Sequence, residues 1–395
     1  MNYIIFEDNN CHLLRPFTDL HASFDLRVGI LTNIDRVKYL ISENDTIQLY
    51  VRSDIKKIVE EKYPNYVVNP EIYKPGVFLN GNCLWNSDSI EAIKGDYSYS
   101  NENGLVAFSS DTNINFHDIE KLIQDKSLVS SKISVESIKY LWDSFDFLDN
   151  MIQFDSEFLY KYKKGDLHPS VTLLNQDNII INEGCNIGAG AVLDASEGPI
   201  ILDEYSYVDI GALIKGPTYI GKYSKINPGA KIRGPVSIGP YCKIGGEVED
   251  SIIQGFSNKQ HDGFLGHSYI GEWVNLGANT NTSDLKNNYG KIKVKISHDD
   301  IIDTNKMFVG SIIGDFTKTA ISTRLNSGTF IGTGSNVFDN SFIEKFIPSF
   351  SWGKENKVGL NRFLDSCFKM MNRRDVDMSV CLKERLIQLY QKIEI

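Results

Sequence analysis

The chain has 395 residues, of which 42% are hydrophobic and 23% charged, and its formal net charge is −10. This length predicts two or three domains with ample cores. The negative charge excludes a general nucleic-acid or membrane-surface binder, because nothing offsets the repulsion from phosphates. A local basic site for one phosphorylated ligand remains compatible with it.

The sequence carries no evident targeting or membrane segment. Its start, MNYIIFEDNN, has no basic region and only a short apolar run, unlike a secretory signal. No segment approaches the roughly 18 apolar residues that cross a bilayer. The six cysteines form no CxxC pair, which disfavours a zinc site. We therefore predict a cytoplasmic protein with free thiols, no membrane segment and no bound metal.

Strand-like and helix-like runs alternate over residues 1–130. This alternation predicts an α/β domain with a parallel sheet. A helical connector is expected over 131–168, mainly within 136–165. The expected strands are 3–6, 46–51 and 76–81, the expected helices are 25–41, 53–63 (with Ser53 as a possible cap) and 116–125, and a hairpin with a Gly turn is expected at 95–108.

From about residue 169 the aliphatic residues recur every six positions. A six-residue repeat with glycine turns predicts a parallel β-helix over 169–340, in which the aliphatic side chains point inward and stack between coils. The ladder lapses near Glu249–Asp250, resumes at Phe264, Ile270 and Leu276, and appears again at Leu325. Its unbroken part is Val208, Ile214, Ile220, Ile226, Ile232, Ile238 and Ile244.

Two segments interrupt the ladder, 252–263 and 279–294, and we expect both to leave the solenoid as loops. Residues 341–395 are expected to form a C-terminal cap that ends in a helical tail. His261 and His267 each precede an expected core residue by three, so the repeat explains their spacing of six. Since successive faces point in different directions, the pair makes a poor metal site. His261 ends an expected loop, which favours a functional role for it.

Long motifs make the chain similar to one known family. They are LRPFTDL…DLRVGILT, YLWDSFDF, GGEVEDSIIQGFSNKQHDGFLGHSYIGEWVNLGANTNTSDLKNNYG and FIPSFSWG. With them the chain resembles the bifunctional uridylyltransferase/acetyltransferases of N-acetylglucosamine-1-phosphate synthesis, and most closely a Bacteroidetes-type offshoot described as sugar nucleotidyltransferases. The resemblance implies a reduced nucleotidyltransferase-like domain and a left-handed β-helix that trimerises. It also implies transfer from acetyl-CoA, or another acyl-CoA, at the subunit interface.

The family pattern H-x-x-[YF]-x-G followed by N-[IL]-G-A matches His261–Gly266 and Asn275–Ala278. The match implies that His261 is the catalytic base, and histidine suits this role because it titrates near neutral pH. It implies that Ala278 and Ser311 contact the coenzyme. The candidates for acceptor binding are Asn275, Asn288, Tyr289, Phe264 in place of a tyrosine, and the basic Lys259.

Two departures from the family leave the substrate open. Asn227 stands where the acetyltransferase has an arginine for the sugar phosphate, and the acidic GGEVED replaces the region of its partner lysine. In the first domain the triphosphate loop is reduced to LLRPFT, and Asn80-Gly81-Asn82 replaces an acidic metal ligand. A Mg²⁺ ion is therefore expected only if nucleotidyl transfer persists.

Three hypotheses follow. The first is a homotrimeric N-acyltransferase that acts on an amino sugar, a sugar phosphate or a nucleotide sugar in the synthesis of cell-surface glycan precursors. The second is a sugar-1-phosphate nucleotidyltransferase. The third is a non-catalytic solenoid that binds a sugar nucleotide or scaffolds a partner.

Overall fold

The computed structural model describes residues 1–94, 97–124, 130–158, 165–338 and 343–393. It divides into two compact units. The first comprises Met1–Arg27, Leu31–Leu141 and Val380–Arg385, and the second comprises Val28–Ile30, Trp142–Ser379 and Leu386–Ile395. Over the described residues, no helix has both the length and the apolar character that a membrane crossing needs.

The first unit is built on a seven-stranded sheet with the order β10-β7-β8-β5-β1-β2-β3. The three predicted strands are present as β1, β2 and β5, and β1 pairs with both others in parallel. The sheet is mixed, however, because β8 runs antiparallel to β5 and to β7 in the predicted hairpin. The strands are β1 (Asn2–Phe6), β2 (Thr46–Tyr50), β3 (Val67–Val68), β5 (Gly76–Asn80), β7 (Ser98–Asn101), β8 (Gly104–Ser110) and β10 (Ser130–Lys132).

Helices cover both faces of this sheet. Helices α1 (Asn33–Leu40) and α2 (Lys56–Lys62) pack on one face, and α4 (Phe116–Gln124) packs on the other. Both α1 and α2 are shorter than predicted. The hydroxyl of Thr32 accepts from the Asp35 N–H and caps α1, so the helix cannot start at residue 25. Helix α2 starts after Ile55, so Ser53 is not its cap.

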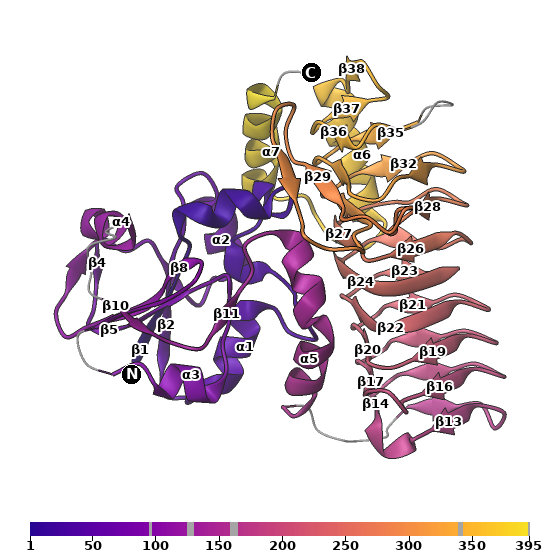
Figure 1. Cartoon of the computed structure of the whole chain (residues 1–395), viewed down its shortest axis with the longest axis horizontal. Helices are drawn as coiled ribbons and strands as arrows, with labels where there is room; N and C mark the ends of the chain where they lie inside the picture. Colours follow the sequence, from indigo (N-terminus) through magenta and orange to yellow (C-terminus); the bar gives the residue numbers. More distant parts are fainter. Residues whose placement is uncertain (95–96, 125–129, 159–164, 339–342, 394–395) are drawn as a thin grey trace. The chain divides into compact units, whose positions relative to one another are not determined.

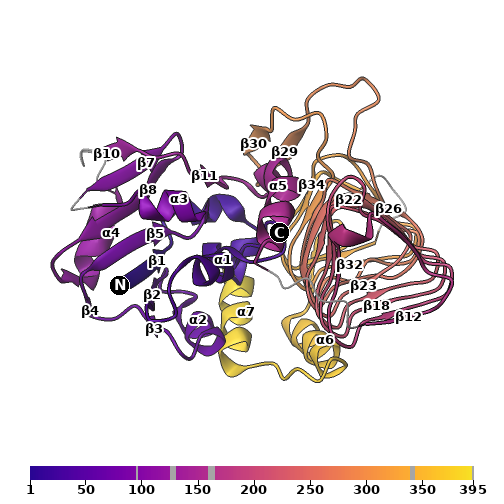
Figure 2. The same cartoon turned by 90° about the horizontal axis from the view of Figure 1, so that it is seen from below.

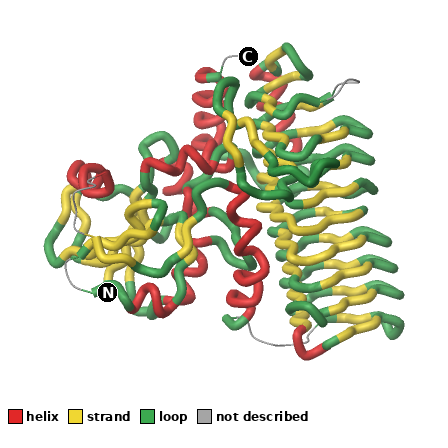
Figure 3. The backbone as a smooth tube through the Cα atoms, viewed as in Figure 1, coloured by secondary structure: helices red, strands yellow, loops and turns green. Residues whose placement is uncertain are grey.

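The second unit contains the predicted parallel β-helix. Figures 1 and 3 show its strands stacked in rows, and Figure 2 shows the coils end-on. Ile214 pairs with Ile232, the equivalent ladder residue three hexapeptides further along the chain, so three hexapeptides make one coil. All seven residues of the unbroken ladder are buried and share one hydrophobic core. Burying each of them contributes about 1.5–3 kcal/mol.

Three rows of strands form the faces of the solenoid. One row contains β15 (Asn186–Ile187), β18 (Tyr207–Val208), β21 (Lys225–Ile226), β23 (Lys243–Ile244) and β25 (Asn258–Lys259). A second contains β14 (Ile179–Ile181), β17 (Ile200–Leu202), β20 (Thr218–Ile220), β22 (Lys231–Ile238), β24 (Glu247–Gly255), β27 (Tyr269–Glu272), β31 (Ser311–Ile313), β34 (Thr329–Ile331) and β36 (Phe346–Ile347). The third contains β13 (Thr172–Leu174), β16 (Val192–Asp194) and β19 (Leu213–Lys215), and it continues along β22 and β24 to β26 (Phe264–Gly266), next to which β28 (Asn281–Thr282) lies.

The interruptions differ from those expected. Ile238 pairs with Ile253, so the coil between them is shorter than three hexapeptides, and residues 252–255 lie in β24. The coil is thus shortened rather than extended by a loop. Leu265, not Phe264, points into the core. His261 therefore precedes its core residue by four and His267 by three, and the two histidines are not in the same phase.

The second interruption is a true insertion, although it starts later than expected. Ile270 pairs with Ile313, so the chain between them is much longer than one coil, and Thr282 still pairs within the solenoid. The inserted chain includes an antiparallel pair, β29 (Lys293–Lys295) and β30 (Ile301–Asp303).

Aromatic residues stack along one corner of the solenoid. Neighbouring ring centroids lie 4.4 to 6.2 Å apart, with interplanar angles of at most 18°. Each of these residues has a positive φ. This backbone conformation is unfavourable for residues other than glycine, and the stacking of the rings offsets its free-energy cost. The corner residues are Tyr205, Tyr223, Tyr241, Phe256, Trp273 and Phe316.

The connector and the C-terminal region differ in part from the prediction. The connector helix is α5 (Ser144–Ser156), and residues 159–164 of the expected helix lie outside the described residues. FIPSFSWG forms β36 and β37 (Ser351–Trp352) of the last coil. The predicted terminal helix is α7 (Val380–Lys392).

Sequence reasoning missed helix α6 (Leu360–Asn372). Its side chains Phe363, Cys367 and Met371 recur at every fourth position and are buried. The Phe363 ring contacts the rings of Phe316 and Phe350. Helix α6 therefore packs along the aromatic corner instead of covering the end of the solenoid.

Candidate functional site

His261 lies just after β25, at the start of the short segment that leads to β26. Its side chain is exposed, and within the described part of the chain its imidazole has no hydrogen-bond or ion-pair partner. Its backbone carbonyl accepts from the Lys259 ammonium at 2.8 Å. The backbone is thus fixed while both ring nitrogens remain available to a substrate.

His267 has a different environment. Its Nδ1 lies 2.8 Å from Asp284 Oδ2, and its Nε2 faces Asp250 Oδ2 at 3.8 Å. The ring of Phe308 stacks on the imidazole at 5.0 Å, and burial raises the pKa of Asp250. Since both ring nitrogens face carboxylates, His267 ties the inserted segment to the solenoid and has no free nitrogen for a substrate.

We expect His267→Gln to destabilise the protein by about 1–3 kcal/mol, because it leaves two mostly buried carboxylates without their partner. Chemical denaturation of this variant, of Asp284→Asn and of the double variant would measure the coupling. Strictly additive losses would contradict a direct His267–Asp284 interaction.

Lys259 is buried, with 3% of its surface exposed, and it occupies a core position next to Ile244. Its ammonium donates to the carbonyls of Gly245 and His261, each at 2.8 Å. Burial lowers its pKa from 10.5 to about 8. An ammonium held in this way cannot reach an acceptor, so the predicted binding role of Lys259 does not fit the structure.

The remaining predicted residues are spread over the second unit. Asn288 and Tyr289 lie in an exposed turn of the inserted segment, where Asn288 Oδ1 accepts from Gly290 N. Phe264 and Ala278 are half-buried. Ser311 is fully buried in β31, and its hydroxyl has no partner among the described residues, so it does not fit a contact with a coenzyme.

Asn275 lines a cavity of about 380 Å³ between the solenoid and the last turns of α6. Gln260, which precedes His261, lines the same cavity. The walls also carry Lys243 and Lys318 from the solenoid and Lys369, Arg373 and Arg374 from α6 and its end. We refer to this cavity as the basic pocket. The Arg373-Arg374 pair is visible in the sequence, but only the fold brings it to the two solenoid lysines.

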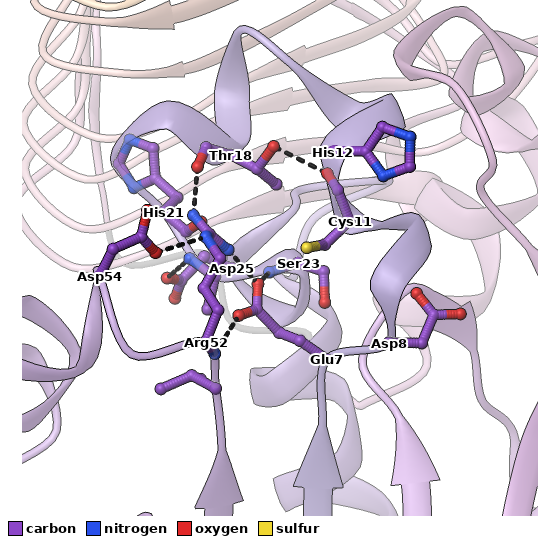
Figure 4. Close-up of polar contacts among 12 residues, drawn as sticks. Glu7, Asp8, Cys11, His12, Thr18, His21, Ser23, Asp25, Arg52 and Asp54 are labelled. Carbon is purple, nitrogen blue, oxygen red and sulfur yellow. Dashed lines mark hydrogen bonds and ion pairs between the residues drawn. The ribbon is translucent and has the colours of Figure 1, made fainter. Parts of the chain in front are cut away.

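A second polar cluster lies where β1 and β2 end in the first unit (Figure 4). Glu7 is buried, and its carboxylate accepts from Arg52 Nη1 at 2.6 Å, from Arg52 N at 3.2 Å and from Ser23 N at 2.8 Å. Arg52 also donates to the carbonyls of Thr18 and His21. Burial raises the pKa of Glu7, whereas the Arg52 guanidinium opposes that rise.

The carboxylates of this cluster do not fit a Mg²⁺ site. Both oxygens of Glu7 are occupied by donors, and Asp8, which lies apart in Figure 4, accepts from Asn10 and Asn80. Among the described residues, no three acidic, histidine or cysteine side chains are grouped closely enough to hold a metal. Asn80, predicted to stand where an acidic ligand is expected, instead donates to Asp8 at 3.1 Å and to Leu105 O at 3.0 Å.

Two family models match the chain. Residues 3–164 match the model described as sugar nucleotidyl transferase, and residues 201–249 match the bacterial transferase hexapeptide model of six repeats. These matches and the topology confirm a nucleotidyltransferase-like α/β domain, a parallel β-helix of hexapeptide repeats, and C-terminal helices.

The similarity to curated relatives covers only part of this chain. It is 34% identical over 116 residues to "Bifunctional protein GlmU" of Methanococcus aeolicus, covering 28% of this chain and 27% of that protein. It is 29% identical over 99 residues to the "Bifunctional sugar-1-phosphate nucleotidylyltransferase/acetyltransferase" of Sulfurisphaera tokodaii, covering 25% and 24%. The chain thus matches about a quarter of the length of each of these relatives.

Solved structures with some likeness include the Arabidopsis UDP-N-acetylglucosamine acyltransferase, with a TM-score of 0.25 and 15% identity over 59% of this chain and 90% of that one. LpxA from Acinetobacter baumannii has a TM-score of 0.19 and 15% identity over 54% of this chain and 76% of that one.

Proposed function

We propose that this protein transfers an acyl group from acyl-CoA to the amino group of an amino sugar or of its phosphorylated or nucleotide derivative. The observation that carries the proposal is the exposed His261 imidazole, which has no partner among the described residues and lies on a hexapeptide solenoid next to Gln260 of the basic pocket. The family-model matches and the names of the curated relatives support this reaction class.

In the proposed reaction the acceptor reacts as the neutral amine, and His261 removes the proton that the nitrogen loses as it attacks the carbonyl. Acyl-CoA supplies the thioester. The amine nitrogen forms a bond to the thioester carbon and the carbon–sulfur bond breaks. The proton held by His261 then passes to the leaving sulfur. An exposed imidazole suits this exchange because it can accept and return a proton without breaking an existing ion pair.

The proposed acceptor contacts are the residues that the sequence motifs imply, namely Asn275, Asn288, Tyr289 and Phe264. Ala278, the last residue of the motif Asn275–Ala278, is half-buried and remains the proposed coenzyme contact. Asn227 donates to the Gln260 carbonyl at 2.9 Å, so its amide holds the segment before His261. The phosphate of a sugar phosphate would therefore have to bind residues other than Asn227.

The assay for this function combines purified protein, acetyl-CoA and a panel of amino sugars, their 1-phosphates and their nucleotide derivatives, with release of the CoA thiol as the readout. At least one acceptor should give turnover above the rate of thioester hydrolysis. No turnover with any member of the panel, from protein shown to be folded, would contradict the proposal and favour the non-catalytic alternative. We also propose a homotrimer, which light scattering after gel filtration tests directly.

Sugar nucleotidyl transfer is a second candidate, because the match to that family model covers residues 3–164. The network in which Glu7 and Arg52 neutralise each other weighs against it, since Arg52 is then not free to bind a triphosphate. Release of pyrophosphate from nucleoside triphosphates in the presence of sugar 1-phosphates would establish this activity.

A further inference from the structure

We infer that the basic pocket between the solenoid and α6 is a binding site for a ligand with two adjacent phosphate groups, such as a nucleoside diphosphate moiety. Asn275 lines this pocket and is also a proposed acceptor contact, but the inference holds whether or not His261 transfers an acyl group. It rests on the geometry of the pocket, on the charges that line it, and on the lack of anionic partners for those charges among the described residues.

The walls of the pocket are well supported. Helix α6 is anchored by Phe363, Cys367 and Met371, and the pocket lies beside its C-terminal turn. The solenoid side is β-structure with Phe256 and Trp273 of the aromatic corner at its edge. Arg374 Nη2 donates to Asn258 Oδ1 at 2.7 Å, which fixes one guanidinium at the wall. Because rigid elements hold it, the pocket can be preformed for a ligand.

Five cationic side chains line this cavity, and none of its described lining residues is a carboxylate. Lys369 is exposed and pairs with Asp365 on its own helix, so it is already neutralised. The other four cations have no ion-pair partner among the described residues. They are Lys243, Lys318, Arg373 and Arg374. In a chain with a net charge of −10, four cations without a counter-charge around one cavity need an explanation.

The crowding of positive charges also affects the pKa values of the pocket residues. Burial, together with the nearby Arg374 and Arg373, lowers the pKa of Lys243. Burial also lowers the pKa of Lys318. An anion in the pocket would relieve this repulsion and would make charge-assisted hydrogen bonds to both arginines.

The end of α6 explains only part of the arrangement. Cations at a helix C-terminus are favourable because the helix dipole is negative there, which accounts for Arg373 and Arg374. It does not account for Lys243 and Lys318, which come from separate strands of the solenoid. Four cations from three parts of the chain therefore indicate a shared anionic ligand.

The size and lining of the pocket define the class of ligand. A volume of about 380 Å³ exceeds what one orthophosphate needs and lies in the range of small-molecule sites. Amides of Asn258, Gln260 and Asn275 and the edge of Trp273 offer contacts for the non-phosphate part. A pyrophosphate group joined to a nucleoside satisfies both sets of contacts. A free nucleotide, a nucleotide sugar and coenzyme A all contain that chemistry.

The test is calorimetric titration of the full chain with sodium pyrophosphate, UDP, CoA and orthophosphate at low and at moderate salt. We expect pyrophosphate to bind more tightly than orthophosphate, with affinity that falls as salt rises. Lys243→Gln and Arg373→Gln should each weaken pyrophosphate binding about tenfold or more. If UDP or CoA binds more tightly than pyrophosphate, the tighter of the two shows whether the diphosphate of the natural ligand belongs to a uridine nucleotide or to a coenzyme.

Matched controls are available within the same elements. Lys231→Gln removes an exposed solenoid lysine outside the pocket, and Arg362→Gln removes an exposed arginine of α6 outside the pocket. Both should bind pyrophosphate within about twofold of the wild type. The pocket variants should unfold at an unchanged or higher temperature without ligand, which separates lost binding from misfolding. No binding of any diphosphate at about 1 mM, or equal binding by pocket and control variants, would overturn the inference.

Discussion

Replacing His261 by glutamine is expected to lower kcat for acyl transfer by about 10²–10⁴-fold, the usual contribution of a general base. Glutamine keeps the length and hydrogen-bonding capacity of the side chain but cannot take up a proton. Because the His261 imidazole is exposed and has no partner among the described residues, the fold should not depend on it. The melting temperature should therefore remain close to that of the wild type, and KM for the acceptor should change little.

His267→Gln provides the matched control for this experiment. It removes the same chemical group one hexapeptide further along the chain, from a site enclosed by Asp284 and Asp250. The expected pattern is reversed, with a loss of stability and with kcat retained at a temperature where the variant is folded. Full activity in His261→Gln together with lost activity in His267→Gln would show that the assignment of the base is wrong.

The second large effect is expected at Lys259, where the free energy of unfolding should depend on pH. Burial holds the pKa of Lys259 at about 8 in the folded protein, against 10.5 as its ordinary value. Below pH 8 both states carry the proton, and the cost of burying the charge is fully present. Between pH 8 and 10.5 only the unfolded chain binds the proton, so stability rises with pH, in total by roughly 3 kcal/mol.

Lys259→Met is the variant that isolates this effect. Methionine has a similar unbranched shape and suits the core position, but it has no ammonium. Near pH 7 its net effect should be small, because the relief of a buried charge is offset by the unpaired carbonyls of Gly245 and His261. The stabilities of the two proteins should therefore diverge from pH 7 to 10.5, because the wild type gains stability that the variant does not gain. Parallel curves for the two proteins would rule out a depressed pKa at Lys259.

The fold was largely predictable because its signals are local and periodic. The hexapeptide ladder from Val208 to Ile244 indicates the inward side chains directly, and all of them are buried. The prediction failed where the period changes. The coil between Ile253 and Ile270 is one residue short of three hexapeptides, so the inward position is Leu265 and not Phe264, and an exact hexapeptide count cannot show such a shift. Helix α6 was missed although its buried residues recur at every fourth position.

The candidate site was less predictable because its contacts are distant in sequence. His261 could be singled out from a motif, but nothing local shows that Lys259, just before it, points into the core. The basic pocket joins Lys243 to Arg373, which lie far apart in the sequence, through the packing of α6. Asp284 reaches His267 from the start of the inserted segment, in a contact that no short pattern contains.

The stacked corner also bears on how this solenoid can change in length. The rings of Tyr241 and Phe256 remain stacked across the shortened coil, and those of Trp273 and Phe316 remain stacked across the inserted segment. The spacing between neighbouring rings is close to the separation of adjacent strands, so each coil contributes one ring. Duplication or loss of a whole coil would leave an uninterrupted column, and extra residues elsewhere can leave the surface as loops. The aromatic corner thus allows whole coils to be gained or lost during evolution while the remaining coils keep their register.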